Sequence, residues 1–372
     1  MQVPRQDSER LLESRPRVPA LSRTAIVLQH ICDARRPLGL AELTQLTGFP
    51  KSSVMGICHA LTDENLVTRG VDGTYALGPR VFEFGSAVRA GNKSLHDIGF
   101  TYPLDESFFL AEIGALHAEA TTIAAHLRVL SANEDKRLQA QQICDFVLDG
   151  VELILVEPVA SEGLEAACEQ ARAARIPVVA IGSALSGADA VVATDNTKAG
   201  ALAGAALARA LSGRGHVAVV GGIPITANSD RVAGFLGAVA THPELSIVAT
   251  SRGELDAASG ERAAEEILAD HPTVAGFFAS NDQIAIGISR VLARRNLFVP
   301  IVAVDGARGA VDQIRAGGPI VASATQDPVA LVRAAIEIGS ALHSGADVIR
   351  RSHYITPRLI DAQNAQEYEP WG

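Results

Sequence analysis

The chain has 372 residues, more than the roughly 250–300 at which one hydrophobic core usually divides, so two or three cores are expected. Hydrophobic residues make up 48% of the chain and aromatic residues only 4%, a balance typical of parallel strands covered by helices rather than of a sandwich. The net charge of −10 argues against a protein coated in nucleic acid. The composition therefore predicts an α/β protein.

The charge is unevenly distributed along the chain. Residues 1–92 hold 11 Lys and Arg against 9 Asp and Glu, whereas the remainder holds 21 against 33. A slightly basic head on an acidic body fits a DNA-reading module joined to a part that does not itself contact DNA.

Targeting and metal-binding signals are missing from the sequence. The first twenty residues contain no apolar run of the signal-peptide type, and no uncharged apolar stretch reaches transmembrane length. The four cysteines are far apart and form no CxxC pair, which favours reduced cysteines in a cytosolic protein without a zinc site. They are Cys32, Cys58, Cys144 and Cys168. We expect no cofactor, no metal and no membrane partner.

Residues 1–20 are polar and predict a disordered leader. Apolar residues then recur at helical spacing from Thr24 to Ile31, and LAELTQLT at 40–47 predicts a short second helix. Gly48 supplies a turn, and Pro50 begins a third helix, PKSSVMGICHALTDEN. This order and spacing predict a helix-turn-helix.

The third helix divides into an inward and an outward face. Val54, Ile57, Cys58 and Leu61 can point into a core. The outward residues could face a major groove, and two short strands at 66–69 and 74–77 predict a wing whose Arg69 suits a phosphate. The candidate DNA-binding residues are Lys51, Ser52, Ser53, Met55, His59 and Arg69.

LAELTQLTGFPKSSV, ENLVTRGVDGTYALG and PRVFEFGSAV together resemble the DNA-binding domain of IclR-type regulators over about residues 21–91. The resemblance implies a winged helix-turn-helix at 21–78 and a linker helix at 79–95, with Met55-Gly56 where the family often has His-Arg. A winged domain of this kind can also serve as a protein-contact module. The apolar stripe of the linker helix either dimerises or packs on its own domain. It comprises Val81, Phe82, Phe84, Gly85 and Val88.

From Leu95 onward, short apolar runs alternate with amphipathic helical stretches. About ten such runs exceed one ordinary sheet of about six strands, so two α/β lobes with parallel sheets are expected. Ligands of open parallel sheets bind outside the carboxyl ends of the strands, and polar residues collect there. These residues are Asp105-Glu106, Gly182-Ser183, Asp195-Asn196, Asn281-Asp282, Asp305 and Gln326-Asp327.

IPVVAIG, TDNTKAGALAG, SDRVAGF, HPTVAGFFASNDQIAIG, VPIVAVDGA and IVASATQDP follow one another in the order of the periplasmic sugar-binding-protein fold, which they resemble over about residues 96–361. The similarity is to ribose-binding proteins and LacI-type sensor domains. It implies a first lobe at 96–195 and 327–350, a second lobe at 196–326 and a tail at 362–372. It also implies three crossings between the lobes, near Asp195-Asn196, near Gln326, and between Tyr354 and Leu359.

Carried over by position, the resemblance makes Phe108 and Phe109 an aromatic floor for a sugar. It makes Arg231, Asn281, Asp305 and Gln326 the polar ligands. Local alternatives exist for several of these: the two phenylalanines as core, Arg231 as a surface helix residue, and Asn281 or Asp305 as a helix cap.

Four positions depart from the ribose-binding pattern. Glu106 stands where Asn is common, Tyr102 replaces a small residue, Ser183 with Gly182 replaces an Asp-Arg pair, and Leu255 replaces a stacking aromatic. Gaining a carboxylate and losing an arginine disfavours anionic ligands, because a buried unpaired charge is costly. We expect a neutral sugar or polyol, or an amine-bearing one.

No GxSxG, GxxxxGK[ST] or HExxH motif is present, so the sequence does not favour an enzyme. The leading hypothesis is a cytosolic DNA-binding repressor or activator, whose partners are operator DNA and a small sugar or polyol effector, working as a homodimer or alternatively a tetramer. The alternatives are a cytosolic solute sensor that uses the winged helix for protein contacts, and a sugar transport receptor.

Overall fold

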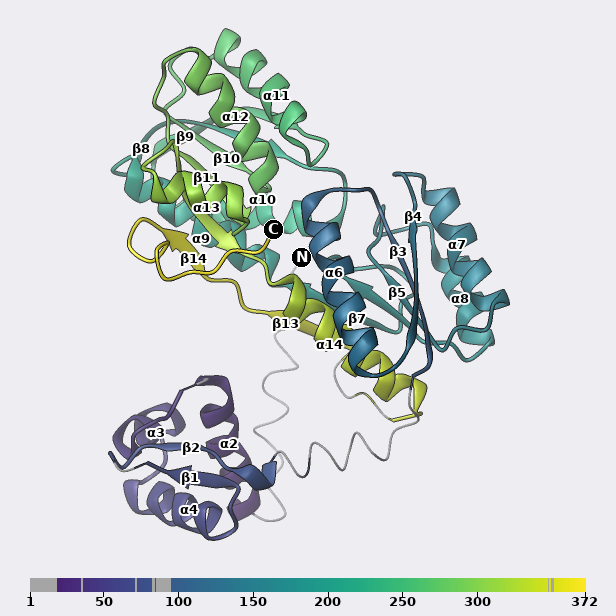
Figure 1. Ribbon diagram of the computed structural model, residues 1–372. Helices are drawn as coiled ribbons and strands as arrows, with labels where there is room; N and C mark the ends of the chain where they lie inside the picture. Colours follow the sequence, from purple (N-terminus) through teal and green to yellow (C-terminus); the bar gives the residue numbers. More distant parts are fainter. Residues whose placement is uncertain are drawn as a thin grey trace, which may run out of the picture. The chain divides into compact units, whose positions relative to one another are not determined.

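The computed structural model describes residues 19–34, 36–70, 72–81, 84, 95–346, 348 and 351–372, which fall into two compact units, 1–92 and 93–372 (Figure 1). We call the first unit the head and the second the sensor. The first 18 residues of the predicted leader and most of the predicted linker helix lie outside the described residues. Pro19 and Ala20, which were assigned to the leader, instead begin the first helix, and Leu95, assigned to the linker helix, is irregular.

The head contains three helices and a two-stranded antiparallel sheet among its described residues. They are α2 (Pro19–Ala34), α3 (Leu40–Thr47), α4 (Lys51–Asp63), β1 (Val67–Arg69) and β2 (Tyr75–Leu77). Gly48 ends α3 in the left-handed region at φ 67°, where glycine has no steric penalty, and its N–H donates to the Thr44 carbonyl. The turn that follows redirects the chain into α4, as the helix-turn-helix prediction requires.

A small apolar core holds the head together. Its buried members come from all three helices, both strands and the segment before α3, and they are Val27, Ile31, Leu38, Leu43, Val54, Cys58, Leu61, Val67 and Tyr75. Ile57 packs at the edge of this core, whereas Ile26 is exposed despite its apolar side chain. The inward face predicted for the third helix is confirmed in its buried residues.

The sensor has two six-stranded sheets, one in each lobe. The first lobe has the order β13-β7-β6-β5-β3-β4, with all neighbours parallel. Its strands are β3 (Asp97–Tyr102), β4 (His126–Ser131), β5 (Leu153–Val156), β6 (Val178–Ile181), β7 (Ala190–Thr194) and β13 (Ser352–Ile355). Its helices are α6 (Ser107–Thr122), α7 (Lys136–Leu148), α8 (Glu165–Ala173) and α14 (Pro328–His343).

The second lobe has the order β14-β12-β11-β10-β8-β9. Its strands are parallel except for β14, the last in chain order, which runs antiparallel to β12. Its strands are β8 (Arg214–Gly221), β9 (Glu244–Arg252), β10 (Gly276–Ala279), β11 (Ile301–Asp305), β12 (Ile320–Thr325) and β14 (Leu359–Asp361). Its helices are α9 (Asn196–Ala210), α10 (Thr226–Val239), α11 (Ala257–Asp270), α12 (Asp282–Arg294) and α13 (Arg308–Arg315).

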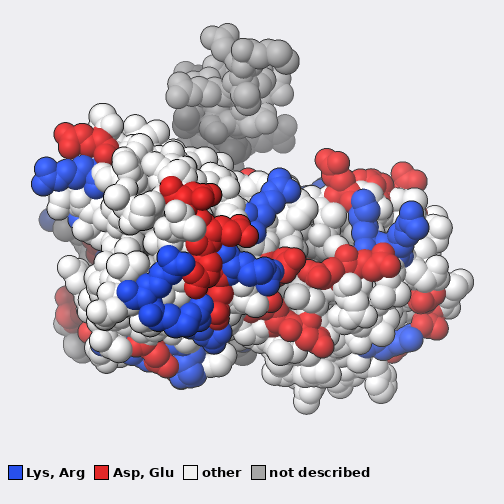
Figure 2. Space-filling model, turned by 90° about the horizontal axis from the view of Figure 1, so that it is seen from above, with Lys and Arg blue, Asp and Glu red and all other residues white. Residues whose placement is uncertain are grey.

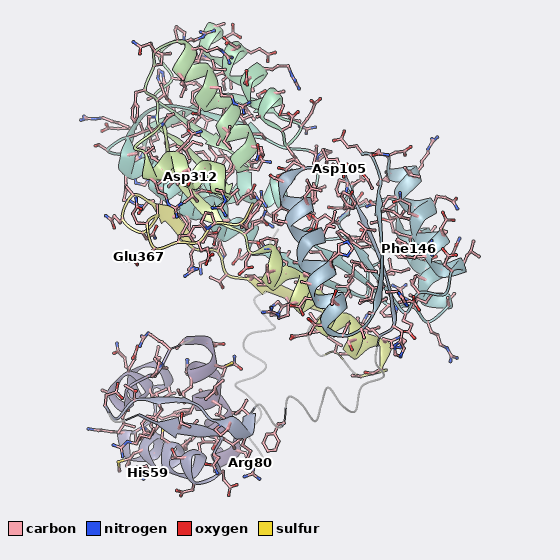
Figure 3. The ribbon with its side chains drawn as sticks, viewed as in Figure 1. His59, Arg80, Asp105, Phe146, Asp312 and Glu367 are labelled. Atoms are coloured by element: carbon pink, nitrogen blue, oxygen red, sulfur yellow. The ribbon has the colours of Figure 1, made fainter. Side chains whose placement is uncertain are left out.

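Each central strand is buried on both faces because helices cover both sides of each sheet (Figure 1). Packing is close at Gly99 of β3, where an added Cβ would lie 2.6 Å from Cγ of Phe146 on α7; Phe146 is labelled in Figure 3. The ring of Phe146 therefore lies directly against the strand backbone.

The chain crosses between the lobes three times. It leaves β7 at Thr194 and enters α9 at Asn196, returns between β12 and α14, and crosses again between β13 and β14. The last eleven residues do not form a separate tail: Arg315 donates to the carbonyls of Ala365 and Tyr368, so the segment that contains Glu367 lies beside α13 of the second lobe (Figure 3).

The sensor surface in Figure 2 carries acidic and basic side chains next to one another. Ion pairs join α11 to α12, where Arg294 pairs with Glu261 and Glu265 at 2.9 and 3.4 Å. No helix in the described part of the chain is both long and apolar enough to cross a membrane.

Candidate functional site

A cavity of about 30 Å³ lies where the carboxyl ends of the strands of both lobes meet. Its lining includes eight of the ten predicted ligand-binding residues: Glu106, Phe108, Phe109, Arg231, Leu255, Asn281, Asp305 and Gln326. Ile225, Ala227, Asn228, Glu157 and Gly182 complete it. We call it the cleft cavity. Its volume is enough for one or two water molecules.

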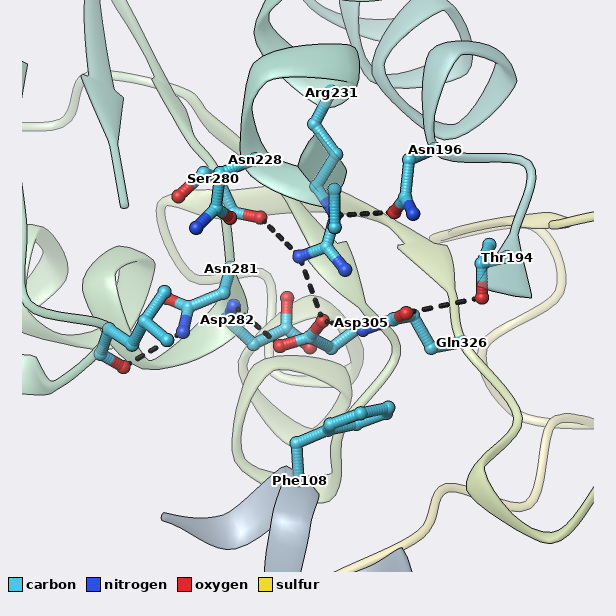
Figure 4. Close-up of polar contacts among 12 residues, drawn as sticks. Phe108, Thr194, Asn196, Asn228, Arg231, Ser280, Asn281, Asp282, Asp305 and Gln326 are labelled. Carbon is cyan, nitrogen blue, oxygen red and sulfur yellow. Dashed lines mark hydrogen bonds and ion pairs between the residues drawn. The ribbon is translucent and has the colours of Figure 1, made fainter. Parts of the chain in front are cut away.

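Arg231 is the central cation of the cleft cavity. Its Nε donates to Oδ1 of Asn196 at 2.7 Å, and its Nη1 donates to the Ser280 carbonyl at 2.8 Å (Figure 4). Only 5% of the residue is exposed, so it is not a surface helix residue. Burial lowers the pKa of the guanidinium, and nearby carboxylates, first that of Asp305, oppose this effect.

Asp305 ends β11 and is held from three sides. Its Oδ1 accepts from Nε2 of Gln326 at 2.8 Å and from Nη1 of Arg231 at 3.4 Å, and its Oδ2 accepts from the Asp282 N–H at 3.3 Å (Figure 4). Its φ of 138° lies in a region that side chains other than glycine rarely adopt, a strain typical of functional sites. Burial raises the pKa of Asp305 to about 6, with Arg231 opposing the rise.

Asn281 and Gln326 line the cavity but already have internal partners. Oδ1 of Asn281 caps α12 by accepting from the Ile284 N–H, and its Nδ2 donates to the Leu255 carbonyl at 2.8 Å. Gln326 accepts from the Thr194 hydroxyl at 3.1 Å while donating to Asp305. Asn281 therefore both caps α12 and lines the cleft cavity.

A residue that the sequence did not indicate, Trp371, packs against the aromatic side of the cavity. The rings of Phe108 and Phe109 lie edge to face at 5.8 Å, and Phe108 also meets Trp371 edge to face at 5.5 Å. The indole Nε1 of Trp371 donates to the Asp305 carbonyl at 3.1 Å and the Gln326 carbonyl at 3.2 Å. The chain terminus therefore reaches the edge of the cleft.

Two predicted ligand-binding residues lie elsewhere. Tyr102 is buried behind Phe109, stacks on Phe100, and donates its hydroxyl to Asp105 at 2.6 Å, so its side chain is used inside the first lobe. Burial raises the pKa of Tyr102, and the hydrogen bond to Asp105 adds to the rise. Ser183 lines a different cavity.

Sequence reasoning also missed a pair of buried carboxyls, Glu112 on α6 and Glu157 after β5. Both oxygens of Glu112 and Oε2 of Glu157 have no hydrogen-bond partner among the described residues. Burial raises the pKa of each carboxyl well above 4.5, and for Glu157 the charge of Glu112 raises it further. Two carboxyls in such a place favour at least one proton on the pair.

A second cavity, of about 310 Å³, lies at the first crossing between the lobes. We call it the hinge cavity. It is lined by the ends of β6 and β7, the starts of α9 and α10, and β13. These residues are Gly182, Ser183, Ala184, Val191, Ala193, Thr194, Asp195, Asn196, Thr197, Thr226, Ala227, Asp230 and Tyr354.

Two glycines bring α10 close to α9 and thereby place Arg231. A Cβ on Gly200 would lie 1.9 Å from the Arg231 carbonyl oxygen, and one on Gly234 would lie 1.9 Å from the Thr197 carbonyl oxygen. No other residue fits at these two positions without moving a helix. The contact therefore fixes the depth at which the guanidinium enters the cleft.

In the head, α4 presents an exposed face made of Lys51, Ser52, Met55 and His59, with Ser53 half-buried (Figure 3). Arg69 on β1 is exposed, and its guanidinium lies over the Tyr75 ring, 5.8 Å from the ring centre, in a cation–π contact. The candidate DNA-binding residues thus lie on one helix face and on the wing.

Comparison with known proteins divides the chain in the same way. The family described as periplasmic binding protein domain matches residues 98–347, and the IclR helix-turn-helix domain matches residues 20–70. The ribose import binding protein of Bacillus subtilis is 28% identical over 70% of this chain and 85% of its own length. The xylitol-binding protein of Mycolicibacterium smegmatis is 27% identical over 76% and 82%.

Among solved structures, a solute binding protein of an ABC transporter from Mycobacterium smegmatis with bound glycerol is similar to the sensor. It has a TM-score of 0.72 and 30% sequence identity, and the match covers 75% of this chain and 99% of that one.

Proposed function

The chain belongs to the periplasmic binding protein family and carries an IclR helix-turn-helix domain, and from this premise we propose that it is a cytosolic transcription regulator. Its effector is a small sugar or polyol without an anionic group, bound between the two lobes of the sensor. The observation that carries the proposal is the presence of both parts, a DNA-reading head and a sugar-binding fold, in one chain.

The lining of the cleft cavity supports a hydroxylated ligand. Phe108 and Phe109 offer apolar faces to C–H groups, and Arg231 and Asp305 offer a donor and an acceptor. The relatives named for ribose and xylitol add support from the family. Because Arg231 is the only Lys, Arg or His in the cavity lining as described, against Glu106, Glu157 and Asp305, an anionic ligand is disfavoured.

Ligand binding requires the lobes to separate and the internal partners to change. The cleft cavity of about 30 Å³ is far below the roughly 300 Å³ at which small-molecule pockets begin, so a sugar enters only another arrangement of the lobes. The ligand shifts DNA affinity to the extent that it prefers one arrangement. In a dimer, this change would alter the separation of the recognition helices, whose half-sites lie about 34 Å apart or a multiple of it.

The proposal is tested first by melting the purified full chain against sugars, polyols, amino sugars and sugar phosphates. A ligand at 100 times its dissociation constant stabilises a one-site protein by about 2.7 kcal/mol. We expect a selective rise with sugars or polyols and none with sugar phosphates. The stabilising compound should then change the affinity of the chain for DNA fragments selected from genomic DNA by the same protein. Stabilisation by a sugar phosphate alone contradicts the proposal.

A transport receptor is the second candidate, because the named relatives are import or solute binding proteins. The two functions are separated by DNA selection. A regulator enriches a small set of fragments that share a sequence, whereas a receptor binds a sugar and enriches none.

A further inference from the structure

The hinge cavity is about ten times as large as the cleft cavity, 310 against 30 Å³. Small side chains leave this space open, among them Ser183, Ala184, Ala193 and Ala227. The cavity is formed by both lobes and the crossing between them, so a molecule bound there would contact the part of the sensor that must bend when the lobes move.

The two cavities are neighbours, because Gly182 and Ala227 line both. Gly182 has φ 71°, and a Cβ there would lie 2.3 Å from Oε1 of Glu157. Glycine therefore leaves only backbone between the hinge cavity and the Glu157 carboxyl. Gly182 and Ala227 are thus the shared wall of the two cavities.

Glu157, on the cleft side of Gly182, is a second sign of a missing hydrogen-bond donor. It is 3% exposed, it lines the cleft cavity, and its Oε2 has no hydrogen-bond partner among the described residues. Buried carboxylate oxygens in folded proteins normally have a donor, and either a proton on Glu112 or a ligand hydroxyl in the cleft cavity would supply one here.

The hinge cavity has the chemistry of a site for a cation. Its lining includes the carboxylates of Asp195 and Asp230 and no Lys, Arg or His side chain. Burial raises the pKa of Asp230, and the neighbouring charge of Asp195 adds to the rise, so the two carboxylates repel each other. An ammonium group would relieve that repulsion through charge-assisted hydrogen bonds. Hydroxyls surround the carboxylates: Ser183, Thr194, Thr197, Thr226 and Tyr354.

We propose that the hinge cavity is a second subsite of the sensor, which takes the ammonium-bearing end of an aminated sugar or polyol whose hydroxylated part occupies the cleft cavity. This inference rests on the proposed function, because it requires an effector between the lobes, and it narrows the effector to one chemical class. The ammonium group is held by Asp230 and Asp195, on the hinge side of Gly182.

The test compares matched probes by isothermal titration calorimetry with the full chain. The pairs are glucosamine and glucose, galactosamine and galactose, mannosamine and mannose, and aminosorbitol and sorbitol. We expect at least one aminated probe to bind about tenfold more tightly than its neutral partner, which corresponds to about 1.4 kcal/mol. Asp230→Asn should abolish this preference and leave the affinity for the neutral partner unchanged.

Two further variants make the result decisive. Glu266→Gln removes a carboxylate from the exposed face of α11 and should leave both affinities unchanged. Ala184→Phe fills the hinge cavity from its exposed edge and should weaken binding of the aminated probe more than that of its neutral partner. The melting temperature of each variant reports whether it is folded.

Equal binding of aminated and neutral partners, with no effect of Asp230→Asn, overturns the subsite and leaves the proposed function standing. Failure of every pair to bind also overturns the subsite. The broader melting panel then decides separately whether the cleft takes any sugar or polyol.

Discussion

Nη1 of Arg231 lies 3.4 Å from Oδ1 of Asp305, and the two side chains, from α10 and from the end of β11, are only 6% and 5% exposed. The distance is long for a charge-assisted hydrogen bond, and the same oxygen is shared with Gln326 at 2.8 Å. A buried pair in such a geometry recovers little of its desolvation cost. Exchanging this contact between Arg231 and Asp305 for hydrogen bonds to ligand hydroxyls therefore costs little free energy.

Removing one member of this pair should uncouple sensing from DNA binding. Asp305→Ala leaves a buried guanidinium without its carboxylate, so we expect the free energy of unfolding of the sensor to fall by about 3–5 kcal/mol in urea denaturation. The effector should no longer raise the melting temperature or change DNA affinity, while DNA binding by the head persists. Arg231→Ala should behave in the same way.

A double variant, Arg231→Met with Asp305→Ala, removes both charges and should regain part of the lost stability without regaining the effector response. If Asp305→Ala still responds normally to the effector, the ligand binds somewhere other than the cleft cavity.

The buried pair of Glu112 and Glu157 should make the sensor less stable at high pH. Both carboxyls have a pKa well above 4.5 in the folded protein, so the folded chain binds more protons than the unfolded chain as the pH rises above that value. The free energy of unfolding therefore falls with rising pH. Glu112→Gln should raise the melting temperature at pH 8 and change it little at pH 4.5.

Two aspartates near the pair also have raised pKa values, so they contribute to the pH dependence of stability in both wild type and variant. Asp305, with a pKa of about 6, and Asp282, whose pKa burial also raises, are present in both proteins, and Arg231 faces Glu157. The difference between wild type and Glu112→Gln therefore isolates the glutamate pair. An unchanged pH profile in the variant would show that the pair does not titrate together.

The alternation of apolar runs with helical stretches predicted the strands from β3 to β12, because each central strand is buried on both faces and carries a continuous apolar run. It did not predict β13 or β14, which are short and lie at the edges of the two sheets. Glu157 follows the buried strand β5 as Asp305 ends β11, so the rule that identified Asp305 could also have identified Glu157. The sequence indicated Glu112 more weakly. It is a charged residue at helical spacing from Phe108 and Phe109, four and three residues earlier, and so lies on the apolar face of α6.

Other parts of the site could not be predicted from local sequence patterns. Trp371 reaches the Asp305 and Gln326 carbonyls from the chain terminus, a contact between distant segments that no periodicity records. The hinge cavity results from small side chains on separate elements, and only the three-dimensional arrangement brings Ser183 and Asp230 to one space. Tyr102 was predicted to bind ligand, but it does not line the cleft cavity, and its hydroxyl donates to Asp105.

The close contact of α9 and α10 should be necessary for ligand binding. Gly234→Ala puts a methyl group 1.9 Å from the Thr197 carbonyl oxygen, so α10 must move and carry Arg231 with it. We expect a lower melting temperature and a loss of effector affinity of at least about tenfold, measured by calorimetry. Gly237→Ala on the same helix meets nothing within 4 Å and should be neutral or stabilising by about 0.4–1 kcal/mol. Equal behaviour of the two variants would contradict this role of the contact.

The exposed face of α4 and the wing should carry the DNA contacts. Lys51→Glu and Arg69→Ala each remove a cation that can neutralise a phosphate, so both should weaken binding to selected DNA fragments, and each should reduce the slope of log affinity against log salt by about 0.9. Effector-induced stabilisation of the sensor should be unchanged, because the head and the sensor have separate cores.

Lys136→Glu, an exposed position on α7, is the matched charge reversal and should leave DNA affinity intact. If Lys136→Glu weakens DNA binding as much as Lys51→Glu does, the effect comes from the overall charge of the protein, and α4 is not the reading helix.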